Sequence, residues 1–212
     1  MPNKSDILIL DVDDTILPCS KEWERHLLRL RPDLKLAYSL TERLQYCYTH
    51  FVNDHFIDHE EFFNIAKNED FYLNCKPYEK AKRMIESLIQ FQNSKKVQIH
   101  FVTHCMNDKQ DPMTATKRAI ILEMMKEYTT PYFYHELNLS ESKAEFIAEN
   151  ISDEISVMID DAPKNLVDVL LNEKIKVSNY IFPKFPHNSY VPSNIETLAR
   201  LKSTKISHFD LE

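Results

Sequence analysis

Two short segments of this chain are apolar, apart from Ser156 in the second, and both are followed directly by aspartates. The first covers residues 7–10 and is followed by a group of acids that begins at Asp11. The second covers residues 155–159 and is followed by Asp160 and Asp161. Segments of this length that are almost entirely apolar are typical of strands buried on both faces of a parallel sheet. We therefore expect two central strands, each with carboxylates at its C-terminal end.

Helical and extended patterns alternate over most of the remaining chain. Apolar residues recur at helical spacing over 77–93, 111–128, 142–151 and 163–172. Alternating or short apolar runs predict further strands at 97–102, 132–134, 175–177 and 180–182. Strands that alternate with helices of this length are joined by right-handed crossovers in a sheet covered on both faces. The predicted fold class is therefore α/β, with a doubly wound, mainly parallel sheet.

Residues 19–75 depart from this alternation. They contain no strong strand pattern, are rich in aromatic residues and place apolar residues at helical spacing. We interpret them as a small helical insertion after the first strand, so that residues 1–18 and 76–212 form one α/β core domain. The aromatic residues have two possible roles, stacking on a nucleobase or forming the core of the insertion. We expect the second role for most of them: Trp23, Tyr46, Phe51, Phe62, Phe63 and Tyr72.

The 212 residues include no glycine, although a chain of this length normally contains about fifteen. Positions that need a positive φ must then be taken by asparagine or aspartate, which tolerate the left-handed region best among the other residues. We expect such positions among Asn93, Asn107, Asn138 and Asn150. Glycine-based nucleotide loops are excluded by the composition.

Charge and cysteine content restrict the partners and the compartment. The formal net charge of -7 disfavours nucleic acid as a partner, because binding along its backbone needs a surplus of lysine and arginine. A small-molecule partner fits better. The four cysteines include no CxxC pair, which favours reduced thiols in a cytoplasmic protein over a zinc site or a disulfide frame. The N-terminal apolar run is too short for a signal peptide or a membrane span.

Polar residues stand at or just after the C-terminal ends of the predicted strands. They are Asp11, Asp13, Thr103, Lys143, Asp160 and Asp161. Such ends converge at one edge of a doubly wound sheet, where these folds bind their ligands. Carboxylates gathered there repel one another unless a cation is bound or their proton affinities shift. Mg²⁺, which prefers oxygen ligands, is the cofactor we expect. The expected metal-binding residues are Asp11, Asp13, Asp160 and Asp161.

A carboxylate beside a bound cation can attack phosphorus, and we assign this role to Asp11. Asp13 could protonate the leaving oxygen and later accept a proton from the attacking water. Thr103 and Lys143 are expected to hold the phosphoryl oxygens. His104 has two interpretations, a hydrogen bond to the substrate or a residue that only flanks the strand.

Each of these residues can also be explained without a functional role. A DxDxT segment alone is often a group of acids that caps a helix or a loop. Lys143 falls in the first turn of a helix, where its charge opposes the helix dipole, so a binding role is favoured over a solvated lysine. Lys164 is an alternative for that role. A second predicted strand also ends in paired acids, and this favours a catalytic role over acids that only cap a helix or a loop.

Four segments resemble, in order and spacing, the motifs of phosphatases in the haloacid dehalogenase-like superfamily. They are DVDDT at residues 11–15, FVTH at 101–104, Lys143, and MIDDAPKN at 158–165. The resemblance covers the whole chain as a Rossmann-like core, with residues 19–75 where such enzymes insert a helical cap. It implies a cap that closes over the site and Mg²⁺-dependent hydrolysis through an aspartyl-phosphate intermediate.

The resemblance also implies individual roles. Asp161 would bind the metal directly with Asp160 close behind it, and Asp13 would contribute its main-chain carbonyl. Asp14 and Asp160 stand where the superfamily often has glycine. The paired aspartates followed by a proline and the short cap are similar to the 5'(3')-deoxyribonucleotidase-like branch.

The expected function is hydrolysis of a phosphate monoester, with a nucleoside monophosphate as the preferred substrate. The enzymatic alternatives are a sugar phosphate, another metabolite or a polynucleotide end, and transfer of the phosphoryl group to an acceptor other than water. The non-enzymatic alternative is a binding protein of the same fold. Such a protein would be expected to lack a catalytic acid, yet Asp11, Asp13 and Asp161 are all present.

Overall fold

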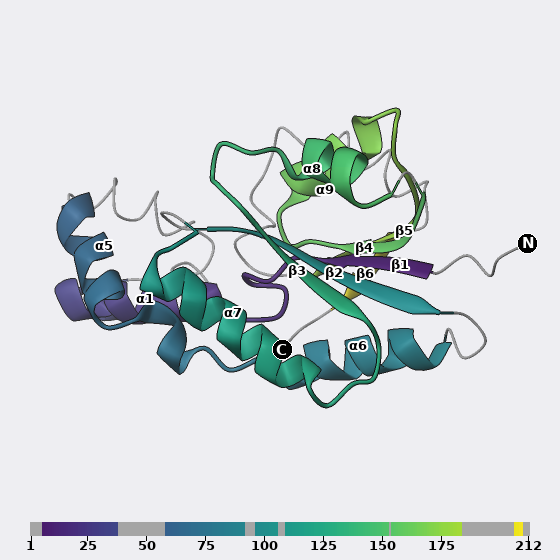
Figure 1. The fold of residues 1–212 in the computed structure, drawn as a ribbon. Coiled ribbons are helices and arrows are strands. Elements are labelled where there is room, and N and C mark those ends of the chain that lie inside the picture. The colour runs from purple at the N-terminus through teal and green to yellow at the C-terminus, as the bar shows by residue number, and fades with distance from the viewer. Residues whose placement is uncertain are drawn as a thin grey trace, which may run out of the picture.

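Six parallel strands form one sheet through the middle of the structure (Figure 1), a computed structural model that describes residues 6–37, 58–91, 96–105, 109–152, 154–183 and 206–209. The strands are β1 (Asp6–Leu10), β2 (Val97–His104), β3 (Tyr132–Leu137), β4 (Glu154–Ile159), β5 (Lys176–Pro183) and β6 (Ile206–Phe209). Their order across the sheet is β3-β2-β1-β4-β5-β6. The strand order therefore reverses between β1 and β4, and such a switch point is where α/β sheets bind ligands. The predicted fold class is confirmed.

Strand β1 shows why an apolar run becomes a central strand. It pairs with β2 on one side and with β4 on the other. Leu8 and Leu10 belong to a hydrophobic core on one face of the sheet, and Ile9 belongs to a second core on the other face. This is the alternation that a strand imposes on its side chains. Because both faces are covered, the chain becomes polar only where it leaves the sheet, at Asp11.

Four helices cover the two faces of the sheet (Figure 1). They are α6 (Glu79–Phe91) and α7 (Pro112–Met125) on one face, and α8 (Lys143–Asn150) and α9 (Pro163–Leu171) on the other. The Asp111 carboxylate accepts a hydrogen bond from the Met113 N–H at 2.9 Å and caps α7 as predicted. Ser142 caps α8 in the same way. Among the helices of the described ranges, none combines the length and apolar character that a membrane crossing requires.

The structure differs from the predicted elements in three places. The two short strands predicted at 175–177 and 180–182 are one continuous strand, β5, because pairing with β4 extends along the whole segment. Helix α6 begins two residues later than predicted, at Glu79. The Tyr78 N–H donates to the Ile16 carbonyl at 2.9 Å, which ties the chain before the helix to the residues that follow β1. Strand β6 was not predicted.

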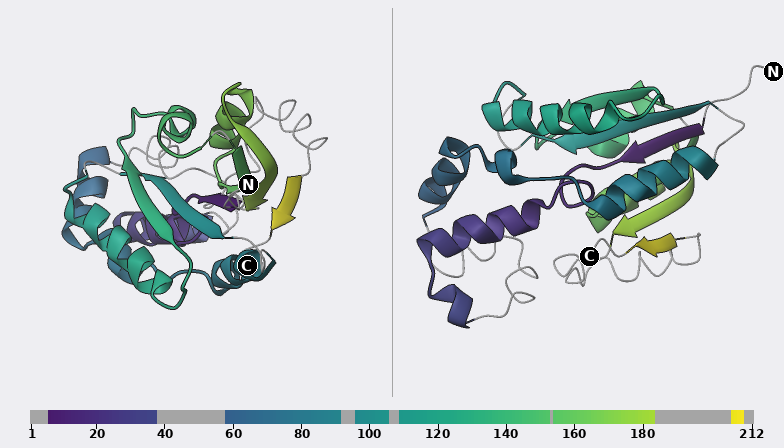
Figure 2. Two further views of the ribbon diagram at one scale, coloured as in Figure 1. Left: turned by 45° about the vertical axis from the view of Figure 1, so that its right-hand side comes forward. Right: turned by 90° about the horizontal axis from the view of Figure 1, so that it is seen from below.

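The described part of the insertion is helical. Its elements are α1 (Cys19–Leu30), α2 (Leu34–Ala37), α5 (His59–Asn68) and the 3-10 helix η1 (Phe71–Asn74). Figure 2 shows α1 and α5 at the end of the sheet toward which β1 points. The ring centroid of Trp23 lies 4.3 Å from that of Phe71 and 5.2 Å from that of Phe62, and all three residues are buried. These aromatic residues therefore form a core, as expected for most of them. Tyr46 and Phe51 lie outside the described residues.

The insertion and the sheet domain share one continuous hydrophobic core. Helix α1 packs against α5, and η1 packs against both and also against α7. Their buried residues belong to the same cluster as those of α6 and α7. The division into a core of residues 1–18 and 76–212 and a cap of residues 19–75 therefore stays a prediction.

Aspartates, not asparagines, take the left-handed backbone positions of the described chain. These residues are Asp14, with a φ of 54°, and Asp70, with a φ of 48°. Asp14 accepts hydrogen bonds from the Ser20 N–H at 2.7 Å and the Ser20 hydroxyl at 2.5 Å, and these local bonds offset the cost of the conformation. The predicted positions were Asn93, Asn107, Asn138 and Asn150. The first two lie outside the described residues, and the prediction is wrong for the last two, which have no positive φ.

A pair of histidines across β2 and β3 should make folding stability depend on pH. His100 Nδ1 lies 3.0 Å from His135 Nε2. Burial, together with His135, lowers the pKa of His100 from 6.5 to about 4. His100 therefore binds a proton less readily in the folded protein than in the unfolded chain. The stability that neutral His100 contributes to the fold is lost as the pH falls from 6.5 toward 4. The loss amounts to about 3 kcal/mol at most.

Replacing His100 by glutamine should remove most of this dependence. The measurement is the free energy of unfolding in urea at several pH values between 7.5 and 4.5, for the wild type and for His100→Gln. We expect the variant's free energy of unfolding to fall less over this range than that of the wild type. Parallel curves for the two proteins would contradict the role given to this histidine pair.

Candidate active site

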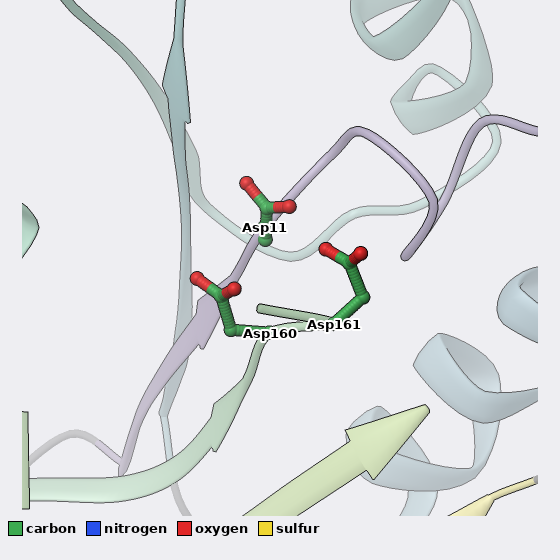
Figure 3. A group of neighbouring side chains, drawn as sticks. All are labelled: Asp11, Asp160 and Asp161. Atoms are coloured by element: carbon green, nitrogen blue, oxygen red, sulfur yellow. The ribbon is translucent and has the colours of Figure 1, made fainter. Parts of the chain in front are cut away.

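The ends of β1 and β4 bring three carboxylates together just beyond the strand tips (Figure 3). Leu10 and Ile159, the last residues of the two strands, are register partners, and the Asp11 N–H donates to the Ile159 carbonyl at 2.8 Å. The residues that follow are therefore neighbours in space. Asp11, Asp160 and Asp161 each offer a carboxylate oxygen, and these oxygens lie within 4.8 Å of one another. The structure thus brings together three of the four residues predicted to bind a metal.

Lys143, the first residue of α8, is buried against two of these carboxylates. Its Nζ donates to Asp11 Oδ1 at 2.6 Å and to Asp160 Oδ2 at 2.8 Å, and only 4% of the residue is exposed. Burial alone would lower the pKa of Lys143, but the charges of Asp11 and Asp160 outweigh it, so the pKa lies above its ordinary value. The lysine is therefore a permanent positive charge at the site. Lys164, the alternative, is exposed.

One lysine does not balance three acids. Burial raises the pKa of Asp11 to about 6, with Lys143 opposing the shift and neighbouring carboxylates adding to it. Burial, again with the neighbouring carboxylates, raises the pKa of Asp161 well above its ordinary value. A divalent cation would stabilise the ionised form of every acid in such a group. The cluster consists of carboxylates alone, a set of ligands that fits Mg²⁺.

Both oxygens of Asp160 already accept hydrogen bonds. Oδ1 accepts from the Ala162 N–H at 2.9 Å and from Asn165 Nδ2 at 3.0 Å. Oδ2 accepts from Lys143 at 2.8 Å, and from the same asparagine at 3.1 Å. With its oxygens occupied in this way, Asp160 orients Lys143 and the start of α9.

The Asp13 carboxylate is held by a different set of groups. Its Oδ2 accepts from Lys117 Nζ at 2.9 Å, and its Oδ1 accepts from the Tyr72 hydroxyl at 3.1 Å and from the Cys19 thiol at 3.2 Å. A third of the side chain, 33%, is exposed. Within the described ranges, the Asp13 side chain is not part of the cluster of three acids. A contribution through its main-chain carbonyl stays a prediction.

Thr103 and His104 are the last two residues of β2, beside β1. Thr103 is buried, and its hydroxyl oxygen accepts a hydrogen bond from Lys117 Nζ at 3.1 Å. His104 Nε2 lies 2.9 Å from the Glu141 carbonyl oxygen, so this nitrogen carries a hydrogen. Burial lowers the pKa of His104 against the opposing effect of that hydrogen bond, and Lys143 lowers it further. The imidazole is therefore neutral at pH 7.

Lys117 and Tyr72, which both donate to Asp13, are among the residues at this site that were not predicted to act there. The sequence does contain a signal for the lysine. Met113, Ile121 and Met124 lie on the buried face of α7, and Lys117 falls on the same face at helical spacing. A lysine within an apolar stripe indicates a buried charge that needs partners. No comparable signal exists for Tyr72, because an aromatic residue in a helical insertion is ordinary core material.

Solved structures with the same fold as this chain are known. No protein-family model and no curated protein sequence matches this chain. A putative phosphatase from Clostridium difficile matches in structure with 15% identity and a TM-score of 0.58, over 98% of this chain and 95% of that chain. A putative beta-phosphoglucomutase from Thermotoga maritima matches with 14% identity and a TM-score of 0.50, over 98% and 95%.

A third match is a putative haloacid dehalogenase-like hydrolase from Bacteroides fragilis, with 10% identity and a TM-score of 0.45, over 97% of this chain and 96% of that chain. At such identities the two matches of higher TM-score establish a shared fold. The chain therefore has the α/β fold of structures described as a putative phosphatase and a putative beta-phosphoglucomutase. This fold agrees with the resemblance of its motifs to the haloacid dehalogenase-like superfamily.

Proposed function

We propose that this chain is a Mg²⁺-dependent phosphate monoester hydrolase in which Asp11 carries the phosphoryl group. The observation that carries the proposal is the buried Lys143, 2.6 Å from Asp11 and 2.8 Å from Asp160, at the point where β1 and β4 end. A carboxylate nucleophile, a fixed positive charge and further acids within one site are what phosphoryl transfer of this kind requires. The fold shared with structures described as a putative phosphatase and a putative beta-phosphoglucomutase supports the same class of reaction.

The proposed reaction has two steps. In the first, an Asp11 oxygen bonds to phosphorus, the bond from phosphorus to the leaving oxygen breaks, and Asp13 gives its proton to that oxygen. In the second, water bonds to phosphorus, its proton passes to Asp13, and the bond from phosphorus to Asp11 breaks. Phosphate is released and both acids are restored. Thr103 and Lys143 hold the phosphoryl oxygens, and the neutral His104 imidazole contacts the substrate.

Mg²⁺ would be held by Asp11, Asp161 and the main-chain carbonyl of Asp13, with Asp160 behind them. When bound, it would neutralise charge on both the nucleophile and the phosphate. The resemblance assigns Asp161 as the direct ligand, and Asp160, whose two oxygens accept hydrogen bonds from Lys143, Ala162 and Asn165, stands behind it.

A nucleoside monophosphate is the substrate we propose, on the basis of the resemblance to the 5'(3')-deoxyribonucleotidase-like branch. The aromatic residues of the insertion add no support, because Trp23, Phe62 and Phe71 are buried against one another. A sugar phosphate, another metabolite and a polynucleotide end are alternative outcomes of the same assay.

Purified protein should release phosphate from at least one nucleoside monophosphate when Mg²⁺ is present. EDTA should lower this rate by about 100-fold or more, because a bound metal stabilises the charge of the transition state by several kcal/mol. Returning Mg²⁺ in excess should restore the rate. The measurement is phosphate release across a panel of nucleotides, sugar phosphates and phosphorylated oligonucleotides.

Three results would change the proposal. Release from other esters with none from any nucleotide would remove the preferred substrate. Release that EDTA does not affect would remove the metal. A phosphorylated alcohol, formed in place of free phosphate when alcohols are added, would identify a phosphotransferase.

A further inference from the structure

Lys117 in α7 is a buried charge that the two-step mechanism does not use. The residue is 0% exposed, and burying an ammonium is costly unless its donors are paired. Its Nζ donates to Asp13 Oδ2 at 2.9 Å, to the Thr103 hydroxyl oxygen at 3.1 Å and to the His104 carbonyl at 2.7 Å. An ammonium has three hydrogens to donate, so these three groups engage it fully.

Two of these partners have proposed roles in the reaction, Asp13 as acid and base and Thr103 as a phosphate ligand. A hydroxyl group has one hydrogen to donate and two lone pairs that accept. Since Lys117 occupies a lone pair of Thr103, the hydrogen of that hydroxyl is left to be donated, as contact with a phosphoryl oxygen requires. One ammonium therefore sets the direction of the Thr103 O–H and the position of the Asp13 carboxylate.

The other oxygen of Asp13 is held from the insertion. The Tyr72 hydroxyl donates to it at 3.1 Å, and the Cys19 thiol lies 3.2 Å from it. Burial, followed by the charge of Asp13, raises the pKa of Tyr72 well above its ordinary value, so the phenol keeps its hydrogen. Lys117 Nζ lies 5.3 Å from the centre of the Tyr72 ring, within the range of a cation–π contact. The two residues thus hold Asp13 together, from α7 and from η1.

We propose that Lys117, supported by Tyr72, is a positioning residue that fixes the Asp13 carboxylate where it meets the leaving oxygen. The inference rests on the proposed function, because only there does Asp13 transfer protons. The competing account is a structural ion pair that fastens α7 to the residues after β1. The two accounts differ in which substrates are affected when the lysine is removed.

Protonation by Asp13 matters most when the leaving oxygen is strongly basic. An alkyl phosphate would expel an alkoxide and needs the proton, whereas para-nitrophenolate is stable without one. The ratio kcat/KM reports the steps up to the first irreversible one, which includes cleavage of this bond. Loss of positioning should therefore lower kcat/KM selectively for alkyl esters, while a loosened fold should lower it for both kinds of ester.

The test compares Lys117→Met with the wild type at saturating Mg²⁺. The substrates are para-nitrophenyl phosphate and thymidine 5'-monophosphate, or the alkyl ester that the panel shows to react fastest. We expect kcat/KM to fall about 100-fold on the alkyl ester and less than about tenfold on the aryl ester. Tyr72→Phe keeps the buried ring and should show the same selectivity, with a loss of about tenfold on the alkyl ester. Lys126→Met, at an exposed lysine directly after α7, is the matched control and should change neither rate.

Equal losses on the two esters, or no loss on either, would overturn the positioning role and leave the proposed hydrolase intact. A wild-type protein that hydrolyses neither ester would overturn the proposed function itself, so the two failures are distinct. Circular dichroism during thermal unfolding shows whether each variant is folded. If Lys117→Met is not folded, Tyr72→Phe decides between the two accounts.

Discussion

Asp11→Asn should abolish phosphate release, with a loss of about 10,000-fold or more. The side chain keeps its shape, but an amide does not form the acyl phosphate on which the proposed reaction depends. The fold should survive, because the change removes one of several repelling acids from a buried cluster. The measurements are phosphate release with Mg²⁺ and the thermal midpoint, which should fall by no more than about 4 °C.

An exposed acid provides the matched control for this variant. Asp33 lies after α1, and 59% of its side chain is exposed in an ion pair with Arg31. Asp33→Asn should keep the wild-type rate. If Asp11→Asn also kept a rate close to that of the wild type, the assignment of the nucleophile would be wrong.

Lys143→Met should reduce both activity and stability. Loss of the ammonium removes the fixed positive charge proposed to stabilise the phosphoryl group, a change that typically costs about 100- to 1,000-fold in kcat. It also leaves Asp11 and Asp160 without their shared partner, which should lower the free energy of unfolding by about 3 kcal/mol. Because the pKa of Lys143 is raised on folding, its contribution is fully present below its unfolded value of 10.5, and so at pH 7.

The comparison with Lys164→Met decides which lysine serves the site. Lys164 follows the paired acids and is exposed, so its replacement should leave phosphate release and the urea midpoint unchanged. The measurements are kcat and urea unfolding at pH 7 for both variants. Loss of activity in Lys164→Met with retention in Lys143→Met would reverse the assignment.

The convergence of the acids could be predicted because it follows from local patterns and one topological rule. The runs before Asp11 and Asp160 are short and mostly apolar, which is unusual for exposed elements, and parallel strands bring their C-terminal ends to one edge. The role of Lys143 could be predicted for a similar reason, because a positive charge in the first turn of a helix is disfavoured by the helix dipole. The hydrogen bond from Lys143 to Asp11 joins residues 132 positions apart, but a local sequence pattern marked each of the two residues.

The surroundings of Asp13 could not be predicted, because they depend on how separate elements pack. Lys117 reaches Asp13 across 104 residues and Tyr72 does so across 59. Helical spacing places Lys117 on the buried face of α7, but it does not say which polar group that face meets. The polar group that Lys117 contacts depends on the rotation of α7 about its axis and on how η1 packs against it.

The left-handed positions illustrate a different limit. Residue preferences allowed asparagine or aspartate, and the positions that we predicted were asparagines, whereas the described chain uses Asp14 and Asp70. Asp14 stands where the phosphatases that its motif resembles often have glycine, and its backbone is left-handed, whereas Asp160, the other such residue, has no positive φ. The Ser20 hydrogen bonds that make an aspartate acceptable there come from the next helix.

Chemical trapping of the intermediate tests the central claim most directly. Protein quenched during turnover with its best substrate is treated with borohydride, which reduces an aspartyl phosphate to homoserine, and the peptides are sequenced by mass spectrometry. We predict homoserine at residue 11 in the wild type, and only when both substrate and Mg²⁺ were present. Steady phosphate release with an unmodified aspartate at residue 11, or with homoserine at another position, would contradict the account.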